Sequence, residues 1–147
     1  MVQIAPSMLA ADFLHLEKDV ELVNKHADIF HLDIMDGTFV PNISYGFPIV
    51  EAIAKIATKP LDAHLMIVHP EKYVDRFAKV GVQMLSFHLN AVDNAGQVLA
   101  QIRAAGMSPG LAINPDIPVE KLFPYLDQCD YVVLMSVFAG FGGQKFI

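Results

Sequence analysis

The strongest constraint on the fold is an alternation of short apolar runs with segments of helical periodicity. The apolar runs are almost continuous, which is typical of parallel strands covered on both faces. Six runs are predicted to be strands: Val2–Pro6, Ile29–Ile34, Leu61–Ile67, Gln83–Leu89, Ser108–Ile113 and Tyr131–Val137. Five intervening segments are predicted to be helices: Phe13–Lys25, Pro48–Ala57, Pro70–Val80, Ala95–Ala105 and Pro118–Leu126. The pattern therefore predicts an α/β protein.

The spacing of these units bears on the architecture. Six strands in this chain give about 24 residues for each strand–helix unit, which is the repeat of a (β/α)8 TIM barrel. Such barrels usually have about 250 residues, so a chain of 147 residues has room for about six of the eight units. A six-stranded open α/β sheet is the alternative. No segment has the composition of a linker, so residues 1–147 are expected to form a single domain.

Composition argues against several classes of protein. Hydrophobic residues make up 54% of the chain and charged residues 18%, which favours a packed core over disorder. The net charge is −6 without a basic cluster, so a nucleic-acid partner is not expected. No apolar run approaches the ~20 residues of a membrane span, and the first residues lack the features of a signal peptide. The single cysteine, Cys129, fits a reducing compartment, and a cytoplasmic protein is expected.

The segment HLDIMDG, residues 31–37, places polar side chains inside an apolar run. Residues two apart on a strand face the same side. One face of this strand therefore carries His31, Asp33 and Met35, and the next predicted strand repeats the design with Asp62, His64 and Met66.

These polar groups could be hydrogen-bonded core residues. Two neighbouring strands that present histidine to the same side instead favour a bound cation, which would compensate the cost of burying them. We therefore predict one divalent metal ion (zinc, iron, manganese or cobalt) held by His31, Asp33 and His64. Asp33 could both bind the metal and move protons, whereas Asp36 is expected to form a turn.

A glycine-rich stretch follows the last predicted strand. Glycine at these positions lets backbone N–H groups converge on an anion, although a flexible turn is the alternative. The stretch consists of Gly140, Phe141, Gly142 and Gly143. Three methionines near strand ends are either core residues or an apolar cover over a polar ligand: Met35, Met66 and Met135. His88 is expected to be structural or to support a neighbouring ligand.

Five segments resemble the ribulose-phosphate 3-epimerase family: APSMLAADF, HLDIMDGTFVPN, LDAHLMI, LAINPDIP and MSVFAGFGGQKFI, in that order. The resemblance runs from Ile4 to Ile147. It implies a (β/α)8 TIM barrel, of which this chain would hold about six units. It also implies inversion at C3 between D-ribulose 5-phosphate and D-xylulose 5-phosphate, a reaction of the pentose phosphate pathway, by proton transfer through an enediolate.

The resemblance further implies roles for individual residues. His31, Asp33 and His64 match three of the family's four metal ligands, and Asp33 matches one of its two acid/base aspartates. The residues that match substrate contacts are Ser7, His64, Met35, Met66 and Met135. Those that match part of the phosphate site are Gly140, Phe141, Gly142 and Gly143. The implied partners are a small phosphorylated ketose and further copies of the chain in a homo-oligomer, with no nucleic acid and no membrane.

The chain also departs from the family pattern. The second aspartate of the family lies on a seventh strand that is absent here, so we expect an N-terminal portion of an enzyme of roughly 210–220 residues, with little or no turnover on its own. Phe138-Ala139 and Asn90 replace residues common in the family.

Three alternatives therefore remain open. The first is a D-allulose 6-phosphate 3-epimerase, and the second is an inactive module that keeps part of the metal or phosphate site. The third is a metal-dependent hydrolase, which the glycine stretch and the order of the motifs disfavour.

Overall fold

A computed structural model describes all 147 residues. Five parallel strands form one sheet in the order in which they occur in the chain. They are β1 (Phe30–Met35), β2 (Leu61–Met66), β3 (Met84–His88), β4 (Ser108–Ile113) and β5 (Tyr131–Leu134). An open doubly wound sheet reverses its strand order and carries helices on both faces. Sequential order is instead that of a barrel wall, and the chain folds as part of a (β/α)8 barrel.

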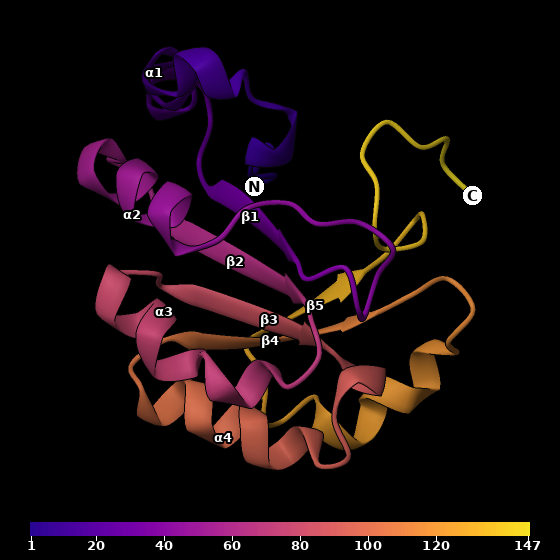
Figure 1. Cartoon of the computed structure of the whole chain (residues 1–147). Coiled ribbons are helices and arrows are strands. Elements are labelled where there is room, and N and C mark those ends of the chain that lie inside the picture. The colour runs from indigo at the N-terminus through magenta and orange to yellow at the C-terminus, as the bar shows by residue number, and fades with distance from the viewer.

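Helices cover one face of the curved sheet (Figure 1). They are α1 (Leu16–His26), α2 (Phe47–Ile56), α3 (Val74–Val80) and α4 (Ala95–Ala104). Short 3-10 helices are η1 (Met8–Ala10), η2 (Phe13–His15), η3 (Pro70–Lys72), η4 (Leu89–Ala91) and η5 (Val119–Tyr125). No helix has both the length and the apolar character that crossing a membrane would require.

The hydrophobic core lies between this helical layer and the sheet. Alternate strand residues such as Leu32, Leu65 and Phe87 are fully buried against helix residues such as Ile53 and Leu99. The opposite set of alternate residues faces the concave side of the sheet. Burying one face in this way fixes the register, because a slip by one residue would turn the polar face into the core.

The prediction of a first strand at Val2–Pro6 is wrong. The structure assigns no strand there, only one bridge between Ser7 and His31. Hydrogen bonds from the backbone N–H groups of Ile29 and His31 to the carbonyls of Ile4 and Pro6 still hold this segment along β1. Pro6 has no N–H to donate, which prevents a continuous ladder at that residue.

The last predicted helix, Pro118–Leu126, is also corrected. It forms the 3-10 helix η5, with Pro124 inside it. Proline lacks the N–H that an α-helix needs at this point and clashes with the preceding turn. Smaller differences concern the ends of predicted elements. Strand β5 stops at Leu134 instead of Val137. The 3-10 helix η2 precedes α1, and the Asp12 side chain begins it by accepting a hydrogen bond from the Leu14 N–H.

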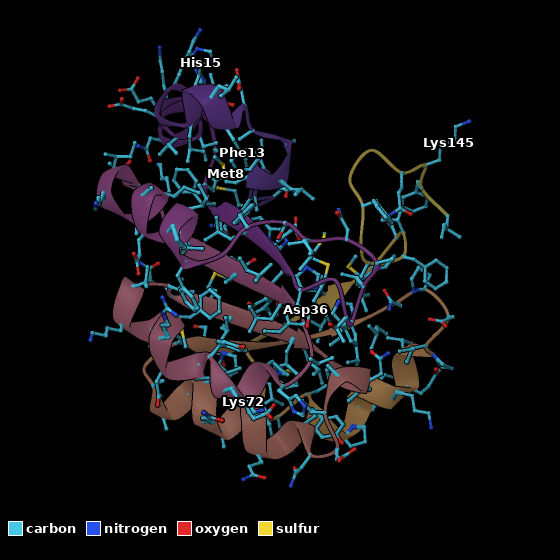
Figure 2. The ribbon with its side chains drawn as sticks, viewed as in Figure 1. Met8, Phe13, His15, Asp36, Lys72 and Lys145 are labelled. Carbon is cyan, nitrogen blue, oxygen red and sulfur yellow. The ribbon has the colours of Figure 1, made fainter.

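Pairing between β1 and β2 positions the polar residues. The two strands are in register, with Asp33 opposite His64 and Met35 opposite Met66. The chain then leaves β1 through Asp36, which lies at the end of that strand (Figure 2). The Asp36 carboxylate accepts hydrogen bonds from the N–H groups of Thr38, Phe39 and Val68, each at 2.8 Å. Asp36 therefore ties together the loops after β1 and β2, as expected for a turn residue.

Candidate active site

Three side chains from β1 and β2 converge on the concave face. Oδ1 of Asp33 lies 3.2 Å from Nε2 of His31 and 3.2 Å from Nδ1 of His64. One ligand atom from each residue lies within 4.8 Å of the other two. Two imidazole nitrogens and one carboxylate oxygen form a donor set that suits a divalent transition metal. The residues predicted as metal ligands are therefore close enough together to hold one ion.

The electrostatics of this cluster favour positive charge at its centre. Burial opposes protonation of His31, but hydrogen bonds and the charges of Asp33 and Asp62 outweigh it and raise the pKa of His31 to about 10. Burial would likewise raise the pKa of Asp33, yet hydrogen bonds from His31, His64 and Ser7 hold that pKa well below its usual range. Asp33 is thus ionised throughout the physiological range, as a metal ligand or proton acceptor must be.

Two serines orient Asp33. The Ser7 hydroxyl donates a hydrogen bond to Oδ2 of Asp33 and accepts one from the N–H of Leu9. The Ser44 hydroxyl donates to the backbone carbonyl of Asp33 at 2.6 Å and accepts from the N–H of Met35 at 3.0 Å. Ser7 was predicted as a site residue, whereas Ser44 was not, because an isolated serine in a loop carries no pattern.

His88 at the end of β3 supports His64. The two rings stack with centroids 5.0 Å apart, and their Nε2 atoms are 2.9 Å apart. Burial, together with the neighbouring His64, lowers the pKa of His88 to about 3. His88 is therefore neutral at pH 7 and can share one proton with His64, which leaves Nδ1 of His64 directed at Asp33.

A cavity of about 500 Å³ lies above this cluster. Every residue that the sequence indicated for a metal, substrate or phosphate site lines it: Ser7, His31, Asp33, Met35, His64, Met66, Met135, Gly140, Phe141, Gly142 and Gly143. Asp33 is the only carboxylate among the lining residues. Met35 and Met66 also pack together with Val40, so they form part of the cavity wall.

The glycine-rich stretch forms one side of the cavity. Gly140 and Gly143 have φ angles of +133° and +71°, which other residues rarely adopt. None of the N–H groups of residues 140–143 donates a hydrogen bond within the protein. The Gln144 side chain instead holds the loop by donating to the carbonyls of Phe138 and Phe141. The free N–H groups can therefore bind an anion such as a phosphate.

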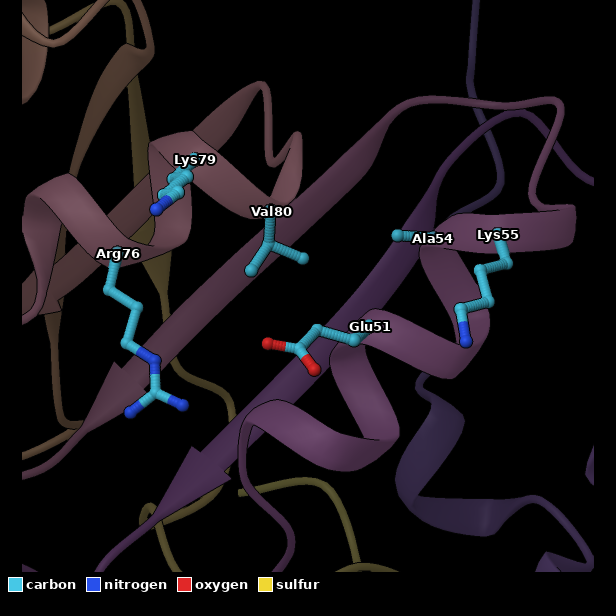
Figure 3. Close-up of a pocket in the computed structure, with 6 residues that line it drawn as sticks. All are labelled: Glu51, Ala54, Lys55, Arg76, Lys79 and Val80. Atoms are coloured by element: carbon cyan, nitrogen blue, oxygen red, sulfur yellow. The ribbon is translucent and has the colours of Figure 1, made fainter.

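A second hollow, of about 600 Å³, lies on the outer surface between α2 and α3 (Figure 3). Its lining residues are Glu51, Ala54, Lys55, Arg76, Lys79 and Val80. The guanidinium of Arg76 already lies 3.7 Å above the ring of Phe47. This hollow shares no residue with the His31–Asp33–His64 cluster, so it is separate from the candidate active site.

Comparison with known proteins identifies the family. A sequence model of the ribulose-phosphate 3 epimerase family matches residues 3–147. The chain belongs to this family. A ribulose-phosphate 3-epimerase of Synechocystis is 47% identical over 149 residues, covering 99% of this chain and 65% of the relative. One from Bacillus subtilis is 45% identical over 148 residues, covering 100% of this chain and 68% of the relative. The chain thus spans about two thirds of the length of these epimerases.

A solved structure supports the fold independently. A chain in the tryptophan synthase complex of Pyrococcus furiosus superposes with a TM-score of 0.60 at 16% identity, covering 90% of this chain and 65% of that one. At this identity the likeness concerns the fold alone.

Proposed function

We propose that this chain forms at least part of a metal-dependent epimerase that acts at C3 of D-ribulose 5-phosphate and forms D-xylulose 5-phosphate. The observation that carries the proposal is that His31, Asp33 and His64 line one cavity together with the glycine-rich stretch, residues 140–143. A site for one metal ion beside a loop that can bind an anion suits a phosphorylated sugar as the ligand. The names of the relatives support ribulose phosphate as that sugar.

The chemistry follows from the position of the proton to be removed. The C3 proton is acidic because C2 is a carbonyl, and its loss leaves an enediolate. A divalent cation at His31, Asp33 and His64 would supply positive charge beside the oxygens that become negative. Asp33, ionised and oriented by Ser7, accepts the C3 proton from one face. The apolar wall of Met35 and Met66 keeps water away from the reacting carbons.

Inversion places a further demand on the site. A proton must return to C3 on the face opposite to Asp33, which requires a second acid or base. Asp33 is the only carboxylate in the cavity lining. We therefore propose that residues 1–147 alone carry out proton exchange on one face, with little or no epimerisation. An inactive module that only binds metal or phosphate would show no exchange at all.

Substrate choice and metal dependence can be tested together. The protein is stripped of metal and supplied with zinc, iron, manganese or cobalt. Proton exchange at C3 is then measured with D-ribulose 5-phosphate and D-allulose 6-phosphate in competition. We expect a metal requirement and preference for the five-carbon substrate. His64→Ala should abolish the metal response, whereas His26→Ala, at an exposed helix end, should leave it intact. A preference for allulose 6-phosphate would instead favour the six-carbon alternative, to which Phe138 and Ala139 in the cavity wall could contribute.

The last part of the proposal concerns cellular location and oligomeric state. One relative, from rice, is named a cytoplasmic isoform. We propose a cytoplasmic homo-oligomer that acts on a small phosphorylated ketose. Fractionation of cells and the mass of the purified protein in solution test these two points.

A further inference from the structure

Asp62 on β2 joins two residues of other strands. Its Oδ2 lies 2.8 Å from Nδ1 of His31 on β1, and its Oδ1 accepts a hydrogen bond of 2.8 Å from the Tyr131 hydroxyl on β5. Asp62 is only 6% exposed. Neither Asp62 nor Tyr131 lines the cavity, and the contact that links them to the site is the one between Asp62 and His31. The sequence placed Asp62 on the same face as His64, but indicated no role for it or for Tyr131.

Gly110 on β4 makes the contact of Tyr131 with Asp62 possible. β4 pairs in register with β5, with Gly110 opposite Tyr131. A Cβ atom at Gly110 would lie 2.3 Å from Cζ of Tyr131 and 2.5 Å from its Cε2. The ring therefore occupies the space that a side chain at residue 110 would need. The absence of that side chain lets Tyr131 reach across the concave face to a residue three strands away.

The hydrogen bond at Nδ1 decides which nitrogen of His31 is available to a metal. An imidazole that binds a metal through one nitrogen usually donates its other N–H to a carboxylate or carbonyl, which fixes the tautomer and the ring orientation. In His31, Nδ1 faces Asp62, while Nε2 faces Asp33. Nε2 is thereby directed at the cluster with Asp33 and His64, and it would become a ligand when a metal ion displaces its proton.

We propose that Asp62 and Tyr131 are positioning residues that hold His31 with Nε2 toward the metal site, and that they set the affinity of this site for a divalent cation. This inference rests on the proposed metal site. The other histidine ligand has a different support, since His64 pairs with the neutral His88 instead of a carboxylate. Loss of Asp62 should therefore weaken one ligand and leave the other in place.

Zinc binding provides the test. Isothermal titration of the metal-stripped protein with zinc at pH 7 compares the wild type with Asp62→Asn and Tyr131→Phe. We expect a 10- to 100-fold weaker affinity for Asp62→Asn and a smaller loss for Tyr131→Phe, which removes one oxygen and keeps the ring. Asp75→Asn is the matched control because it makes the same chemical change at an exposed position on α3, outside the cavity. It should bind zinc like the wild type.

A spectroscopic measurement separates positioning from a purely structural role. In the zinc-loaded wild type, ¹H–¹⁵N correlation spectra of the histidine rings should show a slowly exchanging proton on Nδ1 of His31. In folded Asp62→Asn and Tyr131→Phe proteins this proton should exchange faster with water. Circular dichroism establishes that each variant is folded, and Tyr131→Phe decides the matter if Asp62→Asn does not fold.

The outcomes are distinct. Unchanged zinc affinity and unchanged Nδ1 exchange in the folded variants would overturn the positioning role and leave the proposed function intact. A wild type that binds no zinc would remove the metal site, and the positioning role with it.

Discussion

The close fit of Tyr131 against Gly110 gives a sharp prediction for the variant Gly110→Ala. The added Cβ would meet three atoms of the Tyr131 ring at 2.3, 2.5 and 2.7 Å. The hydroxyl of this ring reaches Asp62, so a displacement of the ring would disturb that contact. We therefore expect the variant to lose the hydrogen bond between Tyr131 and Asp62 as well as local packing.

The magnitude can be worked out from these two effects. Overpacking a well-packed site costs about 1–3 kcal/mol, and a hydrogen bond to a charged group contributes about 1.5–3 kcal/mol. Their sum predicts a loss of roughly 2.5–6 kcal/mol from the free energy of unfolding. A domain has a total free energy of unfolding of only about 5–15 kcal/mol, so the variant should be only marginally stable.

Urea denaturation followed by circular dichroism measures this loss. With a slope of about 2 kcal/mol per molar urea, the midpoint should fall by roughly 1–3 M. Gly46→Ala is the control, because no atom lies within 4 Å of the added Cβ and its φ is −125°. Its midpoint should change little.

The double variant Gly110→Ala/Tyr131→Leu tests the cause. If the Tyr131 ring is responsible, the cost of Gly110→Ala should fall by at least about 1 kcal/mol in the Tyr131→Leu background. The reasoning would be refuted if Gly110→Ala unfolds at the wild-type urea concentration, or if its cost is the same in both backgrounds.

Three further predictions concern the site and its loops. Asp33→Asn should keep the fold by circular dichroism but slow proton exchange at C3 of the substrate by about 100-fold or more, and a residual rate above about one-tenth would contradict its role as a base. Zinc at a hundred times its Kd should add about 2.7 kcal/mol of stability and raise Tm by roughly 5–10 °C, an effect that EDTA should reverse and His64→Ala should lack. Asp36→Asn should cost about 1 kcal/mol at pH 7, because an amide nitrogen cannot accept from the Val68 N–H. Burial would raise the pKa of Asp36, but backbone hydrogen bonds outweigh it and lower this pKa below its ordinary 3.8. The ionised carboxylate therefore stabilises the fold above pH 3.8, and this stabilisation is lost as the pH falls through the lowered pKa. Urea midpoints of wild type and variant should converge at low pH, and a constant difference would contradict this assignment.

The period-two pattern of β1 and β2 was enough to predict that His31, Asp33 and His64 lie together. Alternation placed His31 with Asp33 on one face, and the repeat of the pattern placed His64 beside them, in agreement with the register of the two strands. Near-continuous apolar strands and their repeat length predicted a parallel sheet but left an open sheet as the alternative to the barrel, which the family resemblance implied and the sequential strand order bears out. The cavity then brings the glycine stretch and the methionines to the same place.

Other features depend on contacts that no local pattern records. The hydrogen bond between Tyr131 and Asp62 joins residues 69 positions apart, and it requires a glycine on a third strand. The bond exists because the sheet curves, and curvature is a property of the assembled strands. Val2–Pro6 was predicted as a strand from its apolar residues, but Pro6 interrupts the ladder there. Pro124 similarly turns a predicted α-helix into the 3-10 helix η5.

The most direct test of the proposed site is the exchange of one proton. D-ribulose 5-phosphate is incubated in D₂O with the metal-loaded protein, and the C3 proton is followed by ¹H NMR. The proposed role of Asp33 predicts that deuterium replaces this proton, at a rate about 100-fold or more below wild type in Asp33→Asn. No deuterium uptake at C3 by the metal-loaded wild type, or equal uptake by Asp33→Asn, would contradict it.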